Sequence, residues 1–537
     1  MFKKTTAIIL TICFTVLFAA GCGNSDGAPV KETSAAATEA PEITTKLPKL
    51  DMAKWKHSDD FGFYYQTGVT YCETPADEKY EQLAVFVPEE YMKGTKNADD
   101  TYTCVISDSA RKNGYSAADA PIVMSVYTPG YYSAEALTDV DPEMYIQMFK
   151  MNEFTSQGFV YVFPGCRGID EGAPSGVTDL KAAVRYLRYC DDEIAGDSES
   201  IFAFGMSGGG AQAAILGASG DSGLYDPYLE KIGAVQGASD AIAGSMAWCP
   251  ITSLDTADAE YEWMMGCTRP ERSAEEKAIS DKLAEAFARY VNDSGFTDEN
   301  GASLTLAESA EGIYQAGSYY DYIKKVIEES LNHYLSDDEF YNSSPQEYVD
   351  QLNADKKWVN YDKDSNTATV TSVADFAKNC KQASDKIVAF DQPQSQNNLF
   401  GYGASEPSHY DKILADILYE LKSEYAADYY ADLEKTDFAG NNVEQRVNMY
   451  SPLYYLMKDR GGCGKSNVAK YWRIRTGIEQ MNTSLTTEVN LALALKNYDS
   501  VKNVDFETVW AQGHTDAERT GDSTQNFIEW VHNCMKG

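Results

Sequence analysis

The chain has 537 residues, of which 43% are hydrophobic, and a formal net charge of −37. This length allows one large domain with an insertion, or two to three smaller domains. Because nucleic acids are also negatively charged, so acidic a chain is not expected to bind them, and the acidity alone identifies no substrate.

Residues 1–22 have the pattern of an export signal. Lys3 and Lys4 precede an apolar run at 7–20, and Cys22 follows two residues later. The run is too short to span a membrane. The small residues before Cys22 resemble the lipobox of bacterial lipoproteins. That resemblance implies cleavage before Cys22, acylation of this cysteine, and an extracytoplasmic protein attached to the bacterial membrane surface by lipid. A plain signal peptide is the alternative.

A linker is expected between this signal and the folded part. Residues 23–50 are rich in Ala, Thr, Glu and Pro and predict a disordered tether. The folded part contains an odd number of scattered cysteines, with no C-x-x-C pair and no His/Cys cluster, so we expect no structural zinc and no disulfide framework, with one or two bridges left open outside the cytoplasm. We also expect no cofactor. The nine cysteines are Cys72, Cys104, Cys166, Cys190, Cys249, Cys267, Cys380, Cys463 and Cys534.

Strand and helix patterns alternate from residue 51 onward. Strands are expected at 61–70, 83–87, 121–127, 158–163 and 201–204, and helices at 144–157 and 179–190. The run at 158–163 is apolar at nearly every position, as in a parallel strand buried on both faces. The helix at 179–190 places its apolar residues on one face. This alternation predicts a doubly wound α/β sheet with right-handed crossovers.

The strand at 201–204 leads into Gly-x-Ser-x-Gly, with Ser207 at its centre and a small-residue helical run after it. This order is typical of the nucleophile elbow of α/β-hydrolases, where the serine occupies a sharp strand-to-helix turn. Gly205 and Gly209 are needed there because a Cβ would collide with neighbouring backbone. Ser207 is therefore the candidate nucleophile. A tight turn in another kind of α/β protein is the alternative.

The alternation stops after a strand expected at 244–249. Residues 267–447 are predicted to be mainly helical, with helices at 273–291, 318–335 and 408–425, and Ser273 with Glu276 can form a capping box. An insertion of this size at this point predicts a lid over the carboxyl edge of the sheet. The hydrolase core then comprises residues 51–266 and 448–537. Its second part has strands expected at 471–475 and 504–510 and helices at 485–498 and 524–535.

One of the five histidines, His514, directly follows a predicted strand beyond Ser207. Serine followed by histidine is the chain order of α/β-hydrolases, so His514 is the candidate general base. The N–H groups of Gly208 and of Gly130, in the loop after the third strand, are the expected oxyanion donors. Arg167 lies on the same edge, where it either contacts an acidic substrate group or braces the loops.

The acid of the triad is the least determined member. It is expected in the loop after the strand that ends near residue 477, where Glu479 is the only carboxylate. Asp255 and Asp258, after the preceding strand, are a second source. Without an acid, the imidazole loses orientation and imidazolium stabilisation, at a cost on the order of 10⁴ in rate.

Several stretches outside the elbow resemble the bacterial tannase family and its close α/β-hydrolase relatives. They lie at 173–189, 216–222, 249–252, 257–263, 472–475 and 483–485. The relatives are lid-bearing serine esterases, and the tannases among them hydrolyse galloyl esters. The resemblance implies an α/β-hydrolase fold with a large helical lid, with Ser207 as nucleophile, His514 as base, and Gly208 and Gly130 as oxyanion donors.

The chain departs from the tannase pattern where the resemblance implies substrate contacts. Two aspartates, one catalytic and one contacting galloyl hydroxyls, are replaced by Gln480 and Asn482, and a lid glutamate is replaced by Gln396. The lid lysine falls at Lys381 or Gln382. Galloyl hydroxyls need charged or strongly accepting partners. Asn482 and Gln396 remain candidate substrate contacts, together with Arg167, but for an ester other than a galloyl ester.

These observations lead to one expectation and two alternatives. We expect a surface-anchored serine carboxylic-ester hydrolase that works through an acyl-enzyme on a small-molecule ester, similar to tannases and feruloyl esterases but not galloyl-specific. The amide replacements favour an alternative, a ligand-binding protein that keeps the fold with weakened or lost catalysis. A peptidase of the same fold ranks last, because nothing in the sequence indicates a peptide-sizing domain.

Overall fold

The structure, a computed structural model, describes residues 42–107, 109–138, 142–269, 273–337, 344–381 and 395–537. The signal segment and Cys22 lie outside these ranges. Residues 42–50, expected as part of the tether, instead pack on the folded unit. Thr44 pairs with Gln236 through backbone hydrogen bonds, and Leu47 and Leu50 are buried. Within the described ranges, no helix combines the length and apolarity that crossing a membrane requires.

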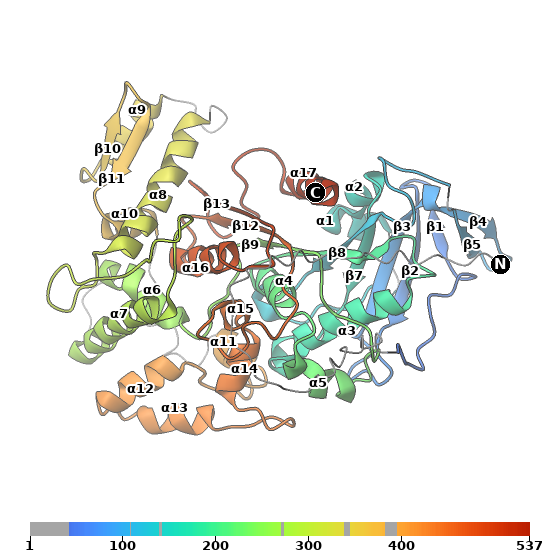
Figure 1. The fold of residues 1–537 in the computed structure, drawn as a ribbon, viewed down its shortest axis with the longest axis horizontal. Helices are drawn as coiled ribbons and strands as arrows, with labels where there is room; N and C mark the ends of the chain where they lie inside the picture. Colours follow the sequence, from blue (N-terminus) through green and yellow to red (C-terminus); the bar gives the residue numbers. More distant parts are fainter. Residues whose placement is uncertain (1–41, 108, 139–141, 270–272, 338–343, 382–394) are drawn as a thin grey trace, which may run out of the picture. The chain divides into compact units, whose positions relative to one another are not determined.

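A nine-stranded sheet forms the centre of the fold (Figure 1). Its order is β1 (Lys56–Ser58), β2 (Phe63–Thr70), β3 (Gln82–Pro88), β7 (Val160–Pro164), β6 (Pro121–Val126), β8 (Asp197–Met206), β9 (Gly244–Trp248), β12 (Tyr471–Gly477) and β13 (Asn503–Val509). The pairings from β1 through β3 to β7 are antiparallel, and all pairings from β7 to β13 are parallel. The predicted α/β-hydrolase fold, with its mostly parallel doubly wound sheet, is confirmed.

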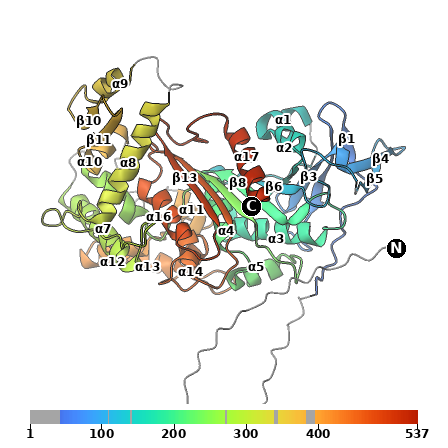
Figure 2. The ribbon, with the colours of Figure 1, turned by 45° about the horizontal axis from the view of Figure 1, so that its top comes forward.

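Helices cover both faces of this sheet (Figure 2). One face carries α3 (Ser175–Tyr189), α4 (Gly208–Ala218), α5 (Asp226–Lys231) and α16 (Leu485–Lys496), and the other carries α1 (Pro142–Phe149), α2 (Met151–Ser156) and α17 (Ser523–Lys536). The single helix expected at 144–157 is two helices, because Lys150 takes a left-handed conformation with φ of 51° between them. The apolar face of α17 packs Phe527 and Trp530 against Phe202 and Trp248 of the sheet.

The segment between β9 and β12 is mainly helical. It contains α6 (Ala257–Met265), α7 (Ala274–Ser294), α8 (Ser318–Ser336), α9 (Pro345–Leu352), α10 (Val373–Cys380), α11 (Ser395–Phe400), α12 (Lys412–Glu420), α13 (Ala426–Leu433), α14 (Val443–Met449) and α15 (Pro452–Leu456). The capping box of Ser273 and Glu276 is present. Residues 42–537 form one unit, so the lid boundaries at 267 and 447 stay a prediction.

Two short antiparallel hairpins were not expected. One pairs β4 (Met92–Lys96) with β5 (Tyr102–Ile106), and the other pairs β10 (Val359–Asp362) with β11 (Thr367–Val370) inside the helical segment. The helix expected at 408–425 shortens to α12, because the Asp411 side chain caps its start and the chain turns at Lys422, where φ is 55°. None of these differences alters the central sheet.

Candidate active site

The elbow places Ser207 at the sharp turn between β8 and α4. Its backbone has φ 61° and ψ −123°, a strained conformation for a residue with a side chain. A Cβ on Gly205 would lie 2.5 Å from the carbonyl carbon of Gly209, and one on Gly209 would lie 2.2 Å from the Val126 oxygen. Both glycines are therefore required by close backbone approach, as the sequence pattern predicted.

His514 follows β13 and reaches the serine. Its Nε2 lies 2.8 Å from the Oγ of Ser207, although the two residues are 307 positions apart in the chain. Burial lowers the pKa of His514 below its usual value of 6.5, so the imidazole is neutral at pH 7. A neutral imidazole at this distance can accept the serine proton.

Gln480 occupies the third position of the arrangement. Its Oε1 lies 2.6 Å from His514 Nδ1. The other end of the amide is also engaged, since Nε2 donates to Thr476 Oγ1 at 2.7 Å and to Glu488 Oε1 at 2.6 Å. Because the amide nitrogen faces these two acceptors, its oxygen faces the histidine. His514 therefore carries its proton on Nδ1 and presents the Nε2 lone pair to Ser207, which is the tautomer that a general base needs.

Behind Gln480 stands a buried carboxylate that the sequence analysis did not single out. Glu488, in the first turn of α16, is fully buried, and its Oε1 also accepts from Thr483 Oγ1 at 2.9 Å. Burial raises the pKa of Glu488 to about 7, and the buried Lys381 partly opposes this rise. Lys381 itself donates to the Ile478 carbonyl oxygen at 3.1 Å, and burial lowers its pKa. The sequence signal that could have identified it is a single charged residue, Glu488, in the otherwise uncharged stretch 485–495. The structure buries this whole stretch in α16.

The structure corrects the expected register of the acid by one residue. Gln480 donates its backbone N–H to the Gly477 oxygen, which makes a tight turn that aims Gln480, not Glu479, at the imidazole. Among the described residues Glu479 has no hydrogen bond with His514. The second source fails as well, because Asp255 accepts from Ser451 at 3.1 Å and Asp258 is hydrogen-bonded to Asp411.

The two expected oxyanion donors lie side by side. A Cβ on Gly208 would lie 3.3 Å from the Gly130 nitrogen and 2.5 Å from the Thr128 oxygen, so the elbow and the β6 loop are in contact. Gly208 is the first residue of α4, where an N–H has no partner within the helix. Among the described residues neither N–H donates to a protein acceptor. Gly130 holds φ 60° and ψ 20° in the short turn at Pro129–Tyr131.

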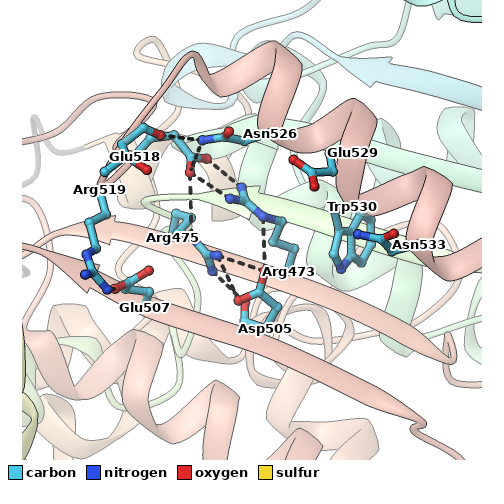
Figure 3. A pocket seen from close by; sticks show the side chains of 11 residues that line it. Arg473, Arg475, Asp505, Glu507, Glu518, Arg519, Asn526, Glu529, Trp530 and Asn533 are labelled. Carbon is cyan, nitrogen blue, oxygen red and sulfur yellow. Dashed lines mark hydrogen bonds and ion pairs between the residues drawn. The ribbon is translucent and has the colours of Figure 1, made fainter.

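A charged cluster anchors the loop that carries His514 (Figure 3). Arg473 of β12 donates to both carboxylate oxygens of Glu518, at 2.5 and 2.7 Å, and Trp248 Nε1 donates to the same carboxylate at 3.0 Å. Arg475 pairs with Asp505 of β13. Both arginines lie in the 472–475 stretch noted in the sequence. They line a cavity of about 360 Å³ with Glu518, four residues beyond the base.

The structure does not bring the remaining expected site residues together with Ser207 and His514. Arg167 is buried and pairs with Asp179, with Nη2 to Oδ1 at 2.7 Å and Nε to Oδ2 at 3.0 Å, so it braces the loop. Asn482 is exposed at the rim of the β12 loop, and Gln396 is half-buried on α11. Gln382 lies outside the described residues. No group of three or more potential metal ligands gathers within the described ranges.

Comparisons with known proteins indicate the same fold. The BD-FAE family model matches residues 91–308. A tannin acyl hydrolase from Lactobacillus plantarum superposes with a TM-score of 0.67 at 25% identity, covering 88% of this chain and 94% of that one. The chain has the α/β-hydrolase fold. A Fusobacterium nucleatum tannase matches it at 28% identity with a TM-score of 0.67, over 88% of this chain and 95% of that one.

A third solved structure, a tannin acyl hydrolase in complex with ethyl gallate, is similar at 26% identity and a TM-score of 0.66, over 88% of this chain and 94% of that one. No curated protein sequence matches the chain. The resemblance to bacterial tannases noted from the sequence is thus confirmed over most of the α/β-hydrolase chain.

Proposed function

We propose that this α/β-hydrolase is a serine carboxylic-ester hydrolase of the tannase and feruloyl-esterase type. The observation that carries the proposal is the 2.8 Å contact between Ser207 Oγ and His514 Nε2, with the imidazole held in the productive tautomer by Gln480. The backbone N–H groups of Gly208 and Gly130, which have no protein acceptor among the described residues, lie beside the same serine. Nucleophile, base and oxyanion donors are the parts that acyl transfer requires.

The proposed reaction proceeds in two halves. Ser207 Oγ attacks the ester carbonyl carbon while its proton passes to His514 Nε2, and the developing oxyanion is held by the Gly208 and Gly130 N–H groups. The C–O bond to the alcohol then breaks, and the alcohol leaves with the proton from His514. A water molecule, deprotonated by the same imidazole, attacks the acyl-enzyme and releases the carboxylic acid and Ser207.

The ester is proposed to be a small-molecule ester without a galloyl group. The similar solved structures include complexes with ethyl gallate and with 3,4-dihydroxybenzoate. In this chain the residues at the positions implied to contact galloyl hydroxyls are Asn482 and Gln396, which carry no charge. A plant polyphenol ester with fewer hydroxyls, or an acylated carbohydrate, suits such neutral contacts better.

Attachment to the cell surface is part of the proposal and rests on residues 1–22 alone. Cys22 is proposed to carry lipid after signal cleavage. Growth of the expressing bacterium with an alkyne-tagged fatty acid should label the wild-type protein in the membrane fraction and leave Cys22→Ala unlabelled. Equal labelling of both proteins would contradict the lipid anchor without affecting the proposed catalysis.

The proposed activity is tested by labelling and turnover together. A fluorophosphonate probe should modify wild-type protein and not Ser207→Ala, and p-nitrophenyl acetate should be hydrolysed only by the wild type. Wild-type protein that neither reacts with the probe nor hydrolyses activated short-chain esters contradicts the proposal.

The neutral amide at position 480 favours a second candidate, a ligand-binding protein with weakened catalysis. A carboxylate contacting the imidazole directly contributes heavily to rate in triads, and among the described residues Gln480, not a carboxylate, contacts His514 Nδ1. Calorimetry with a phenolic ester separates the candidates. Tight binding without turnover, unchanged in Ser207→Ala, supports the binding protein over the esterase.

A further inference from the structure

The hydrogen bonds at His514 continue beyond Gln480 to a carboxylate. We propose that Glu488 is the acid of this active site and acts on His514 through the Gln480 amide, as a positioning residue that touches no substrate. The inference deepens the proposed esterase function and rests on it. Its basis is an unbroken series of contacts from Ser207 to His514, to Gln480 and to Glu488.

The first step of the argument is the orientation of the amide. An ionised carboxylate only accepts hydrogen bonds, so Glu488 requires the nitrogen end of Gln480, which lies 2.6 Å from its Oε1. Thr476 Oγ1 donates to the same Glu488 Oε1 at 3.3 Å, so toward Gln480 it too acts as an acceptor, in a role that Glu488 sets. Glu488 thus turns the amide oxygen toward His514, and that oxygen in turn requires the proton on Nδ1. The carboxylate sets the tautomer of the base across one intervening side chain.

The second step concerns charge. When Ser207 is deprotonated, His514 becomes an imidazolium, and the Gln480 amide supplies only a dipole to stabilise it. Glu488 supplies a negative charge next to that dipole in a buried region of low dielectric constant, since Gln480 is 2% exposed and Glu488 is fully buried. Hydrogen bonds in such a series polarise one another, so the Gln480 oxygen becomes a stronger acceptor.

The third step is the state of Glu488. Lys381, at the end of α10, is the cation that favours the ionised form of Glu488. Thr483 and Gln480 both donate hydrogen bonds to the Glu488 carboxylate. Glu260 on α6, Glu479 in the β12 turn and the Cys249 thiol also face this region. Lys381, 3% exposed, is the buried cation among these acids.

The test exchanges the acid and the amide. Glu488→Gln keeps the shape and the hydrogen bond and removes only the charge. The exchange variant Gln480→Glu with Glu488→Gln moves the carboxylate one position closer, onto His514. Glu260→Gln is the matched control, since Glu260 is equally buried on a neighbouring helix and, among the described residues, its hydrogen bonds go to the hydroxyls of Thr486 and Thr487 and not to Gln480 or His514.

We expect Glu488→Gln to lower kcat on p-nitrophenyl acetate ten- to hundredfold with little change in KM, and to move the acidic limb of the pH profile to lower pH. The exchange variant should recover kcat to at least the wild-type value, and Glu260→Gln should match the wild type. If Gln480 and Glu488 had only a structural role, kcat would not depend on which of them carries the charge. Glu488→Gln would then not lower kcat, and the exchange variant would not restore it.

The outcomes are separable. Wild-type hydrolysis that depends on Ser207, together with Glu488→Gln within twofold of wild-type kcat, overturns the role of Glu488 and leaves the esterase intact. Absence of Ser207-dependent hydrolysis in the wild type overturns both. If Glu488→Gln does not fold, the exchange variant decides the question. A folded exchange variant with kcat at or above wild type supports the role, and one with kcat at least tenfold below wild type overturns it.

Discussion

His514 Nδ1 lies 2.6 Å from the Oε1 of Gln480, so an amide stands where an α/β-hydrolase ordinarily presents a carboxylate to its histidine. The amide can accept the Nδ1 proton and orient the ring, but it brings no charge of its own. Orientation and charge stabilisation are thereby divided between two side chains, Gln480 and Glu488, which are 2.6 Å apart.

Removing the orienting amide should therefore cost activity even though it is neutral. Gln480→Leu leaves Nδ1 without an acceptor and frees the ring to rotate, and we expect kcat to fall by about 10²-fold, less than the roughly 10⁴ seen when a triad loses its acid function. Initial rates on p-nitrophenyl acetate measure this effect. Met481→Ala, an exposed neighbour in the same loop, is the control and should match the wild type. Equal rates for Gln480→Leu and wild type would exclude a role for the amide.

The pH profile should show two acidic steps. His514 must be neutral to act as base, and burial lowers its pKa, so kcat/KM is lost as pH falls through a value below 6.5. Burial raises the pKa of Glu488 to about 7, so a partial loss should begin near pH 7 as this carboxylate is protonated. Measuring kcat/KM from pH 4 to 9 resolves the steps, and the upper one should vanish in Glu488→Gln. A single step above pH 7 in both proteins contradicts this assignment.

The fold could be predicted because its signals are local. Local sequence patterns predict each of three elements: the strand at 158–163, the elbow around Ser207 and the strand before His514. Parallel strands then bring their carboxyl ends to one edge of the sheet. The two-helix break at Lys150 and the hairpin of β4 and β5 depend on single left-handed residues and on edge pairing, which carry no strong periodicity.

Which residue contacts the imidazole could not be predicted from the sequence, because the answer depends on one tight turn. The hydrogen bond from the Gln480 N–H to the Gly477 oxygen decides that Gln480, and not Glu479, faces the imidazole. No residue pattern predicts this hydrogen bond. Glu488 lies eight residues further on, and only the start of α16 at Leu485 brings its side chain back to this turn. Ser207 and His514 needed no such detail, since each directly follows a strand.

The elbow glycine Gly209 should be intolerant of a methyl group. Its Cβ would lie 2.2 Å from the Val126 carbonyl oxygen, and a backbone atom cannot rotate away as a side chain can. We expect Gly209→Ala to lower the free energy of unfolding by at least the ~1–3 kcal/mol typical of overpacking and to reduce kcat by displacing Ser207. Gly513→Ala is the control beside His514, where a Cβ meets nothing within 4 Å. Thermal melts that show equal stability for both variants would contradict the elbow geometry.

The buried pair of Arg167 and Asp179 should contribute to stability and not to substrate binding. Asp179→Ala leaves the guanidinium buried, with Glu81 at 3.6 Å as its remaining carboxylate partner among the described residues. Breaking such a pair from one side costs about 3–5 kcal/mol, so we expect a loss of this size in denaturant unfolding, with KM unchanged. Asp99→Ala, which removes an exposed partner of Lys54, should leave the melting temperature unchanged. A raised KM with unaltered stability would instead indicate that Arg167 contacts the substrate.

Asn482 and Gln396, the neutral residues proposed to contact the acyl group, predict a substrate preference that substitution should reverse. Wild-type protein should hydrolyse methyl benzoate or methyl ferulate with a higher kcat/KM than methyl gallate, because Asn482 and Gln396 offer no charged acceptor to three phenolic hydroxyls. Converting them with Asn482→Asp and Gln396→Glu should raise kcat/KM for methyl gallate about tenfold, since a hydrogen bond to a charged group contributes about 1.5–3 kcal/mol against about 0.5–1.5 kcal/mol for a neutral one. The same double variant on methyl benzoate, which has no hydroxyls to contact, should stay within twofold of the wild type. A wild-type preference for gallate, or an equal gain on both esters, would show that these two positions do not read the acyl hydroxyls.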